Sequence, residues 1–151
     1  MQTNLAVSHR KQTQPADCLA ACAAMVLHYL GRPIAYKRLL NLLDIRRFGA
    51  PAFHILRLAD LGLSVVYKEG TLKDLEQHIR HGEPCIVFVQ TADLPYWSAA
   101  CDHAVVVVGL DEEGVYVNDP AFDEAPQHVP FADFDLAWLA RDYVYALITR
   151  C

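Results

Sequence analysis

The sequence has no stretch that would direct the chain into or across a membrane. Its opening residues, Met1-Gln2-Thr3-Asn4, are polar, so the basic and then apolar pattern of a secretion signal is missing. The unbroken apolar runs are much shorter than the roughly 20 residues that span a bilayer. We therefore expect a soluble, cytoplasmic protein without a transmembrane segment.

The chain also has no excess of basic residues and no closely paired cysteines. It carries 13 Lys and Arg against 18 Asp and Glu, a net charge of −5, so we expect no nucleic-acid surface. The number of cysteines is odd, and none form a C-x-x-C pair: Cys18, Cys22, Cys85, Cys101 and Cys151. This pattern favours reduced thiols and predicts no metal ion. No cofactor motif is present either.

The order of sequence patterns predicts one α+β domain over residues 1–151, with an N-terminal helical half packed on a C-terminal antiparallel sheet. Residues 1–14 are expected to be extended, and the segment with Pro126 and Pro130 to be a loop. Helices are predicted over 18–30, 36–43, 52–61, 71–81 and 131–140. Strands are predicted over 64–68, 85–89, 104–110, 115–118 and 143–149.

The chain is organised around Cys18, which begins a helix that is apolar almost all round. Pro15 precedes the helix, and Asp17 is expected to cap it. Unpaired backbone N–H groups and the helix dipole favour a thiolate at this end, and the thiolate is the nucleophilic form. Cys22 lies one turn further in among apolar neighbours, so we expect it to be a core residue.

A base for this thiol is best sought at His103. Of the seven histidines, His103 alone begins an otherwise apolar strand, where a polar side chain often marks a site. Asp119 follows the second strand of the same predicted hairpin, sixteen residues later, so both side chains lie near its open end. There Asp119 can accept a hydrogen bond from the imidazole and fix its tautomer. The alternative for Asp119 is a simple Asp-Pro turn.

Two further features have both a functional and a structural interpretation. Gln12 and Gln14 precede the nucleophile, and either amide can join the Cys18 backbone N–H in stabilising an oxyanion. The alternative is a solvated glutamine. Tyr96 and Trp97, in the loop before His103, can form a hydrophobic wall for a peptide or can simply cover the core.

Two motifs together resemble a known enzyme family. The first is Gln12, five intervening residues and Cys18; the second combines Asp102-His103-Ala104-Val105 with Tyr116-Val117-Asn118-Asp119-Pro120. They are similar to those of the bacteriocin-processing cysteine peptidases, papain-like enzymes that cut leader peptides after a double glycine. The resemblance implies a papain-like fold, with Cys18 as nucleophile and His103 as general base and acid. It also implies Asp119 as orienting acid and Gln12 as oxyanion donor.

The chain departs from the family pattern at Leu19, because the family usually has glycine directly after the cysteine. A bulky side chain there is expected to narrow the cleft and to affect substrate binding more than catalysis. In the family this domain often precedes a membrane-spanning transporter. No such segment is present here, so we expect a stand-alone relative or an excised domain, and a transporter or biosynthetic partner is left open.

These residues favour a cysteine endopeptidase that forms an acyl-enzyme on a peptide or protein substrate, with small residues at the cut. Two alternatives use the same fold. One is an acyl transferase, in which an amine or thiol resolves the acyl-enzyme. The other is a non-catalytic peptide-binding or docking module, which the retained Cys18, His103 and Asp119 disfavour.

Overall fold

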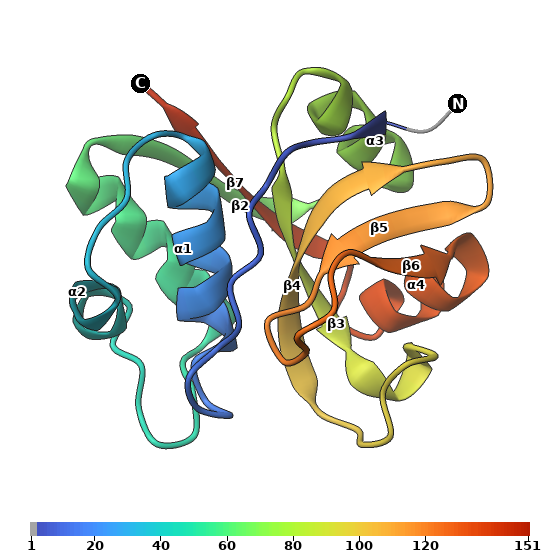
Figure 1. The fold of residues 1–151 in the computed structure, drawn as a ribbon, viewed down its shortest axis with the longest axis horizontal. Coiled ribbons are helices and arrows are strands. Elements are labelled where there is room, and N and C mark those ends of the chain that lie inside the picture. Colours follow the sequence, from blue (N-terminus) through green and yellow to red (C-terminus); the bar gives the residue numbers. More distant parts are fainter. Residues whose placement is uncertain (1–2) are drawn as a thin grey trace.

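The computed structural model describes residues 3–151, in which helices cover both faces of an antiparallel sheet (Figure 1). The α-helices are α1 (Cys18–Tyr29), α2 (Tyr36–Leu42), α3 (Leu72–Arg80) and α4 (Phe131–Leu139), and the 3-10 helices are η1 (Ala52–Leu61) and η2 (Thr91–Asp93). The strands are β1 (Thr3–Asn4), β2 (Leu63–Glu69), β3 (Cys85–Gln90), β4 (Asp102–Leu110), β5 (Gly114–Asn118), β6 (Gln127–Pro130) and β7 (Val144–Arg150). Within residues 3–151, no helix is long and apolar enough to cross a membrane.

The sheet order β2-β7-β3-β4-β5-β6 places β4 near the middle, and β1 pairs with the end of β4. Successive side chains of a strand point to opposite faces, and β4 is apolar on both. Ala104, Val106 and Val108 contact the core that contains α1, whereas Val105 and Val107 contact the core that contains α3 and α4. The predicted α+β class, with a helical half on an antiparallel sheet, is confirmed.

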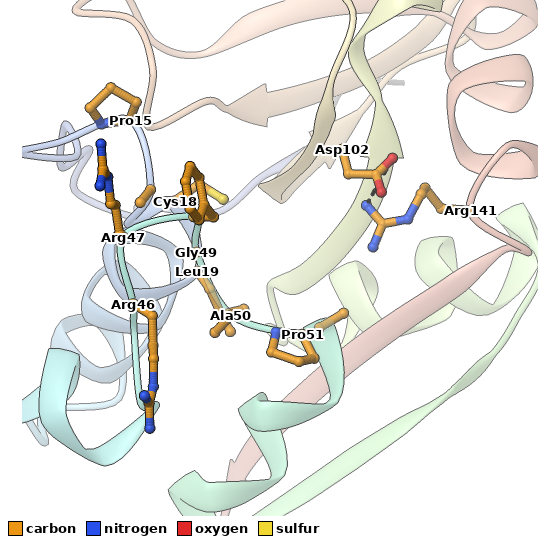
Figure 2. Close-up of a pocket in the computed structure, with 13 residues that line it drawn as sticks. Pro15, Cys18, Leu19, Arg46, Arg47, Gly49, Ala50, Pro51, Asp102 and Arg141 are labelled. Atoms are coloured by element: carbon orange, nitrogen blue, oxygen red, sulfur yellow. Dashed lines mark ion pairs between the residues drawn. The ribbon is translucent and has the colours of Figure 1, made fainter.

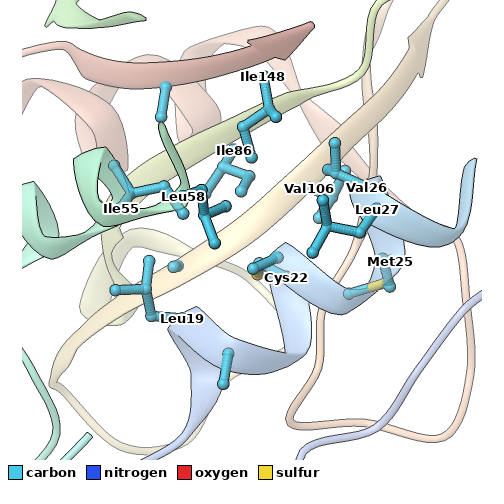
Figure 3. Close-up of a cluster of buried hydrophobic side chains, with 14 of the residues drawn as sticks. Leu19, Cys22, Met25, Val26, Leu27, Ile55, Leu58, Ile86, Val106 and Ile148 are labelled. Atoms are coloured by element: carbon cyan, nitrogen blue, oxygen red, sulfur yellow. The ribbon is translucent and has the colours of Figure 1, made fainter. Parts of the chain in front are cut away.

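Helix α1 occupies the interface between the helical half and the sheet, as its apolar sequence predicts. Figure 3 shows Leu19 and Cys22 of α1 packed with Val106 of the sheet and Leu58 of η1. Burying apolar side chains on several sides of one helix fixes its axis and its rotation. The first residue of α1, Cys18, is thereby held where the helix meets the sheet.

Some expectations for the chain need correction. Residues 127–130 form strand β6, not loop, and pair antiparallel with β5; Pro130 is tolerated because β6 is the last strand in the sheet order. Residues 52–61 are a 3-10 helix rather than an α-helix, closed by Gly62 in the left-handed conformation at φ 79°. The predicted capping box of Thr71 and Asp74 at the start of α3 is confirmed.

Candidate active site

Cys18 lies at the first position of α1, half-buried, with free backbone N–H groups of the first helical turn around it. Figure 2 shows its side chain at the wall of a cavity. The other cysteine of this helix, Cys22, is fully buried, and burial together with the neighbouring charges of Cys18 and Asp119 raises its thiol pKa well above the ordinary value. Cys22 is a core residue, as expected.

The structure brings His103 and Asp119 into direct contact. His103 is the second residue of β4, and Asp119 directly follows β5, the other strand of the hairpin. The His103 Nε2 and Asp119 Oδ1 atoms are 2.7 Å apart, and the two residues are only 5% and 0% exposed. Such a short bond in a site closed to water is a strong interaction, because little solvent screens it.

This contact changes the protonation equilibrium of both groups. Burial lowers the His103 pKa, but hydrogen bonds to Asp119 and Cys18 and their charges outweigh it and raise the pKa from 6.5 to about 9. Burial likewise opposes ionisation of Asp119, yet its bond with His103 holds the carboxyl pKa below the ordinary value. The pKa of His103 therefore depends both on its bond to Asp119 and on the neighbouring Cys18 thiol.

The Asp119 carboxylate accepts three hydrogen bonds besides that of His103. The Tyr96 hydroxyl and the Trp97 indole N–H each donate to Oδ2 at 2.8 Å, and the Ala121 N–H donates to Oδ1 at 2.9 Å. Tyr96 and Trp97 thus lie behind Asp119, and neither lines the cavities beside Cys18. Sequence reasoning singled out these two aromatic residues but not this contact, because nothing in the loop indicates which way the rings point.

Asp17, the residue before Cys18, forms a second buried carboxylate network. It stands at the N-cap position, yet its carboxylate makes no capping bond, so the expected cap is wrong. It accepts instead from Thr13 N at 3.2 Å, Thr13 Oγ1 at 2.7 Å, Gln14 N at 2.7 Å and the Tyr36 hydroxyl at 2.6 Å. Burial opposes ionisation, but these bonds lower the Asp17 pKa. The sequence carries no signal for the contact with Tyr36.

Gln12 is held within the loop that leads to Cys18. Its backbone N–H donates to Pro120 O at 2.8 Å, which joins this loop to the residue after Asp119. Its side-chain Nε2 donates to Gln14 O at 3.0 Å and to Pro15 O at 3.2 Å, while the buried Oε1 has no hydrogen-bond partner among residues 3–151. Gln12 is therefore close to both halves of the site, with its amide donors engaged locally.

The cavity beside Cys18 has a volume of about 660 Å³. Arg46 and Arg47 lie on one side of Cys18, and the ion pair of Asp102 with Arg141, at 3.8 Å, lies on the other (Figure 2). A smaller cavity of about 70 Å³ lies beside Cys18 and His103; its wall also contains Leu19, Ala50, Ala52, Phe88, Asp102, Ala104 and Arg141. The segment 46–52 and Arg141 form much of this cleft, and no sequence motif marked either of them.

Leu19 contributes to both cavities although it is only 4% exposed. Most of its side chain packs in the core with α1 and η1. Within residues 3–151, no group of three or more His, Cys, Asp or Glu side chains is placed to hold a metal ion.

A half-buried cysteine at a helix start, beside a buried His–Asp pair of an antiparallel sheet, defines the class of papain-like cysteine peptidases. The chain belongs to the Peptidase C39 family, whose model matches residues 6–144, and it is a cysteine peptidase. The resemblance inferred from the two sequence motifs is thereby confirmed.

Solved structures share this fold. A C39-like peptidase from Bacillus anthracis has a TM-score of 0.83 at 18% identity, covering 100% of this chain and 98% of the other. A double glycine motif protease from an AMS/PCAT transporter, in complex with its leader peptide, has 0.78 at 21%, covering 100% and 99%. The peptidase domain of Streptococcus ComA, a bi-functional ABC transporter involved in quorum sensing, has 0.79 at 18%, covering 96% and 99%. A search of curated proteins found no match.

Proposed function

We propose that the chain hydrolyses peptide bonds with Cys18 as nucleophile, His103 as general base and acid, and Asp119 as the acid that orients His103. The observation that carries this assignment is the buried His103–Asp119 hydrogen bond of 2.7 Å, with His103 and Cys18 in the wall of the same small cavity. An imidazole with a pKa of about 9 is protonated at neutral pH, so His103 can stabilise the negative charge of a thiolate when Cys18 loses its proton.

The reaction proceeds through an acyl-enzyme. The Cys18 thiolate adds to the scissile carbonyl carbon, and the negative charge moves to the carbonyl oxygen. That intermediate collapses as His103 gives its proton to the leaving amine, which leaves a thioester on Cys18. Neutral His103 then removes a proton from a water molecule that attacks the thioester, and the carboxylic acid product leaves with the thiolate restored.

Gln12 is our candidate for the second oxyanion donor, next to the Cys18 backbone N–H at the start of α1. In the free protein its Nε2 donates to two backbone carbonyls, and the bond to Pro15 O is the longer at 3.2 Å. We propose that substrate binding exchanges this longer bond for one to the oxyanion. A donor that gains its best partner in the transition state contributes to the rate rather than to substrate binding.

We propose substrates with small residues, such as Gly-Gly, at the cut. The cavity beside Cys18 and His103 has only about 70 Å³, and the alanines and the buried Leu19 in its wall leave little room for a larger side chain. A double glycine motif protease bound to its leader peptide has the same fold. Because that neighbour and ComA are transporter proteins, a leader of an exported peptide is the first substrate class to test.

All five cysteines are free thiols, which suits a reducing compartment, and we propose the cytoplasm as the place of action. An acyl transferase would use the same first half-reaction. Adding an amine to the assay distinguishes hydrolysis from acyl transfer, because hydrolysis gives a carboxylic acid product and transfer gives an amide of different mass.

The test compares Cys18→Ala with the matched variant Cys22→Ala, one turn along the same helix. With a leader peptide that contains Gly-Gly as substrate, cleavage followed by mass spectrometry should be abolished in the first variant. The second should retain most of it at a temperature where both variants are folded. Cleavage that persists in Cys18→Ala, or that is lost only in Cys22→Ala, would overturn the assignment of the nucleophile.

A further inference from the structure

The Asp119 carboxylate uses its two oxygens for different partners. Oδ1 accepts from His103 at 2.7 Å and from the Ala121 N–H at 2.9 Å. Oδ2 accepts from the Tyr96 hydroxyl and the Trp97 indole N–H, both at 2.8 Å. Asp119 is 0% exposed, so water does not replace a lost donor from bulk solvent. Four donors therefore fix both the position and the rotation of this carboxylate.

Trp97 also contacts the imidazole directly. The Trp97 and His103 rings are 4.9 Å apart at their centroids and meet edge to face at 65°. Phe122 packs in the same edge-to-face manner on Tyr96 and on Trp97, with centroids 5.2 Å apart in each pair. Tyr96, Trp97 and Phe122 therefore form one packed aromatic group next to the His103–Asp119 pair.

We propose that Tyr96 and Trp97 are positioning residues, which hold Oδ1 of Asp119 on Nε2 of His103 and do not form a wall against the peptide. The proposal deepens the proposed function, because it rests on the roles given there to His103 and Asp119. Its basis is geometric: both donors reach Asp119, one ring touches His103, and neither residue lines a cavity beside Cys18.

The two donors act on catalysis through the charge of Asp119. A hydroxyl and an indole N–H that bind Oδ2 share its negative charge and remove the tendency of the carboxylate to rotate. When one donor is lost, the three that remain still hold the carboxylate in place, but the anion is less well stabilised and holds the imidazolium more strongly. His103 then becomes a weaker acid toward the leaving amine, while the cleft that binds the peptide is unchanged.

The test uses Tyr96→Phe and Trp97→Phe, which remove the O–H or N–H and keep an aromatic ring. We expect kcat to fall about 3- to 30-fold in each with KM changed less than twofold. The alkaline limb of the kcat/KM profile should move to higher pH. Tyr29→Phe is the matched control, because its hydroxyl donates to Gly82 O at 2.8 Å at the far end of α1; it should leave kcat and the limb unchanged.

A second readout does not depend on turnover. The ring resonances of His103 in an NMR titration report its pKa, and both variants should raise that value while Tyr29→Phe should not. A raised KM at unchanged kcat would overturn the proposal and establish the substrate wall. An unchanged His103 titration in both variants would overturn it as well, whether or not the wild-type protein cleaves the chosen peptide. If the wild-type protein shows no Cys18-dependent cleavage of the peptide, the proposed function fails, and the His103 titration still decides this proposal.

Discussion

Two buried carboxylates belong to the candidate site, and each accepts the same number of hydrogen bonds although their roles differ. Asp17 and Asp119 are 2% and 0% exposed, and each accepts four hydrogen bonds. Three of the bonds to Asp17 come from Thr13 and Gln14, in the loop just before it. The bonds to Asp119 include one from an imidazole, whose proton is exchanged within the ordinary pH range.

The difference shows what decides the role of a buried acid. Asp17 organises a stretch of backbone that carries Gln12 and leads to Cys18, so its charge is a structural element. Asp119 is coupled to a titratable group, so its charge sets the acid–base chemistry of His103. Changes at Asp17 should therefore alter stability, and changes at Asp119 should alter the pH dependence of activity.

The largest effect on activity after loss of the thiol is expected from Asp119→Asn. The amide cannot stabilise the imidazolium as a carboxylate does, and kcat/KM should fall by about 10² to 10⁴. The alkaline limb of the pH–rate profile should move from near pH 9 down toward the ordinary histidine value of 6.5. A profile that keeps its limb near pH 9 would show that another group titrates there.

The same coupling predicts a pH dependence of stability. The folded-state pKa of His103, about 9, lies above the ordinary value of 6.5, so protonated His103 favours the folded state. This contribution is fully present below pH 6.5 and is lost as the pH rises through 9. Denaturant unfolding of the wild type and Asp119→Asn should give free energies of unfolding that differ most just below pH 6.5, and the difference should narrow as the pH rises through 9. A constant difference would contradict the coupling.

Asp17→Asn should mainly reduce stability, by about 2–4 kcal/mol at pH 7, because the amide N–H₂ would face donors that now bind a carboxylate. The Asp17 pKa is lowered in the folded protein, so its contribution is present above the ordinary value of 3.8 and is lost as the pH falls through the folded-state value. Urea unfolding at neutral and acid pH measures this. The alkaline limb of activity should stay in place, and a moved limb would mean that the two carboxylates are coupled.

Leu19→Ala changes the cavities beside Cys18 without removing a hydrogen bond of the Asp17 or Asp119 carboxylate. Truncation of this buried side chain should destabilise the protein by about 2–3 kcal/mol. It should also enlarge the small cavity beside Cys18 and His103. The cleavage rate of peptides with residues larger than glycine at the cut should therefore rise relative to that of Gly-Gly peptides. Cleavage rates across a peptide series measure the ratio. An unchanged ratio of cleavage rates would show that Leu19 does not determine the preference for small residues at the cut.

Tyr36→Phe should have the smallest effect, about 1–2 kcal/mol of unfolding free energy, because three donors to Asp17 remain. It is the counterpart of Tyr96→Phe, since each variant removes one tyrosine hydroxyl from one buried carboxylate. Tyr36→Phe should lower the thermal midpoint with no movement of the alkaline limb. If Tyr36→Phe and Tyr96→Phe moved the alkaline limb of the pH–rate profile equally, Asp17 and Asp119 would not differ in their effect on His103.

The parts of the fold that local sequence determines could be predicted. The apolar run after Cys18, the capping box of Thr71 and the hairpin that starts near His103 each depend on neighbouring residues, and each matches the structure. Strand β6 was not predicted because its short segment contains polar residues and a proline. The segment is extended because it pairs with β5. Edge pairing of this kind is a tertiary contact that no local pattern records.

The candidate site divides in the same way. The sixteen-residue spacing of His103 and Asp119 placed both at one end of a hairpin, and their contact follows from that topology. The direction of the Asp17 carboxylate could not be predicted, because a residue at a helix start usually caps the helix and here Tyr36, nineteen positions away, competes for it. Likewise, only the folded loop shows that Tyr96 and Trp97 point at Asp119.

The most direct test of the account is to label the folded protein with a peptide electrophile that ends in Gly-Gly and to map the modified thiol by mass spectrometry. The account predicts a single adduct on Cys18, formed in Cys22→Ala but not in Cys18→Ala, and formed more slowly in Asp119→Asn. Cys101 and Cys151 are exposed and serve as internal controls for unselective labelling. An adduct confined to those two thiols, with Cys18 unmodified, would contradict it.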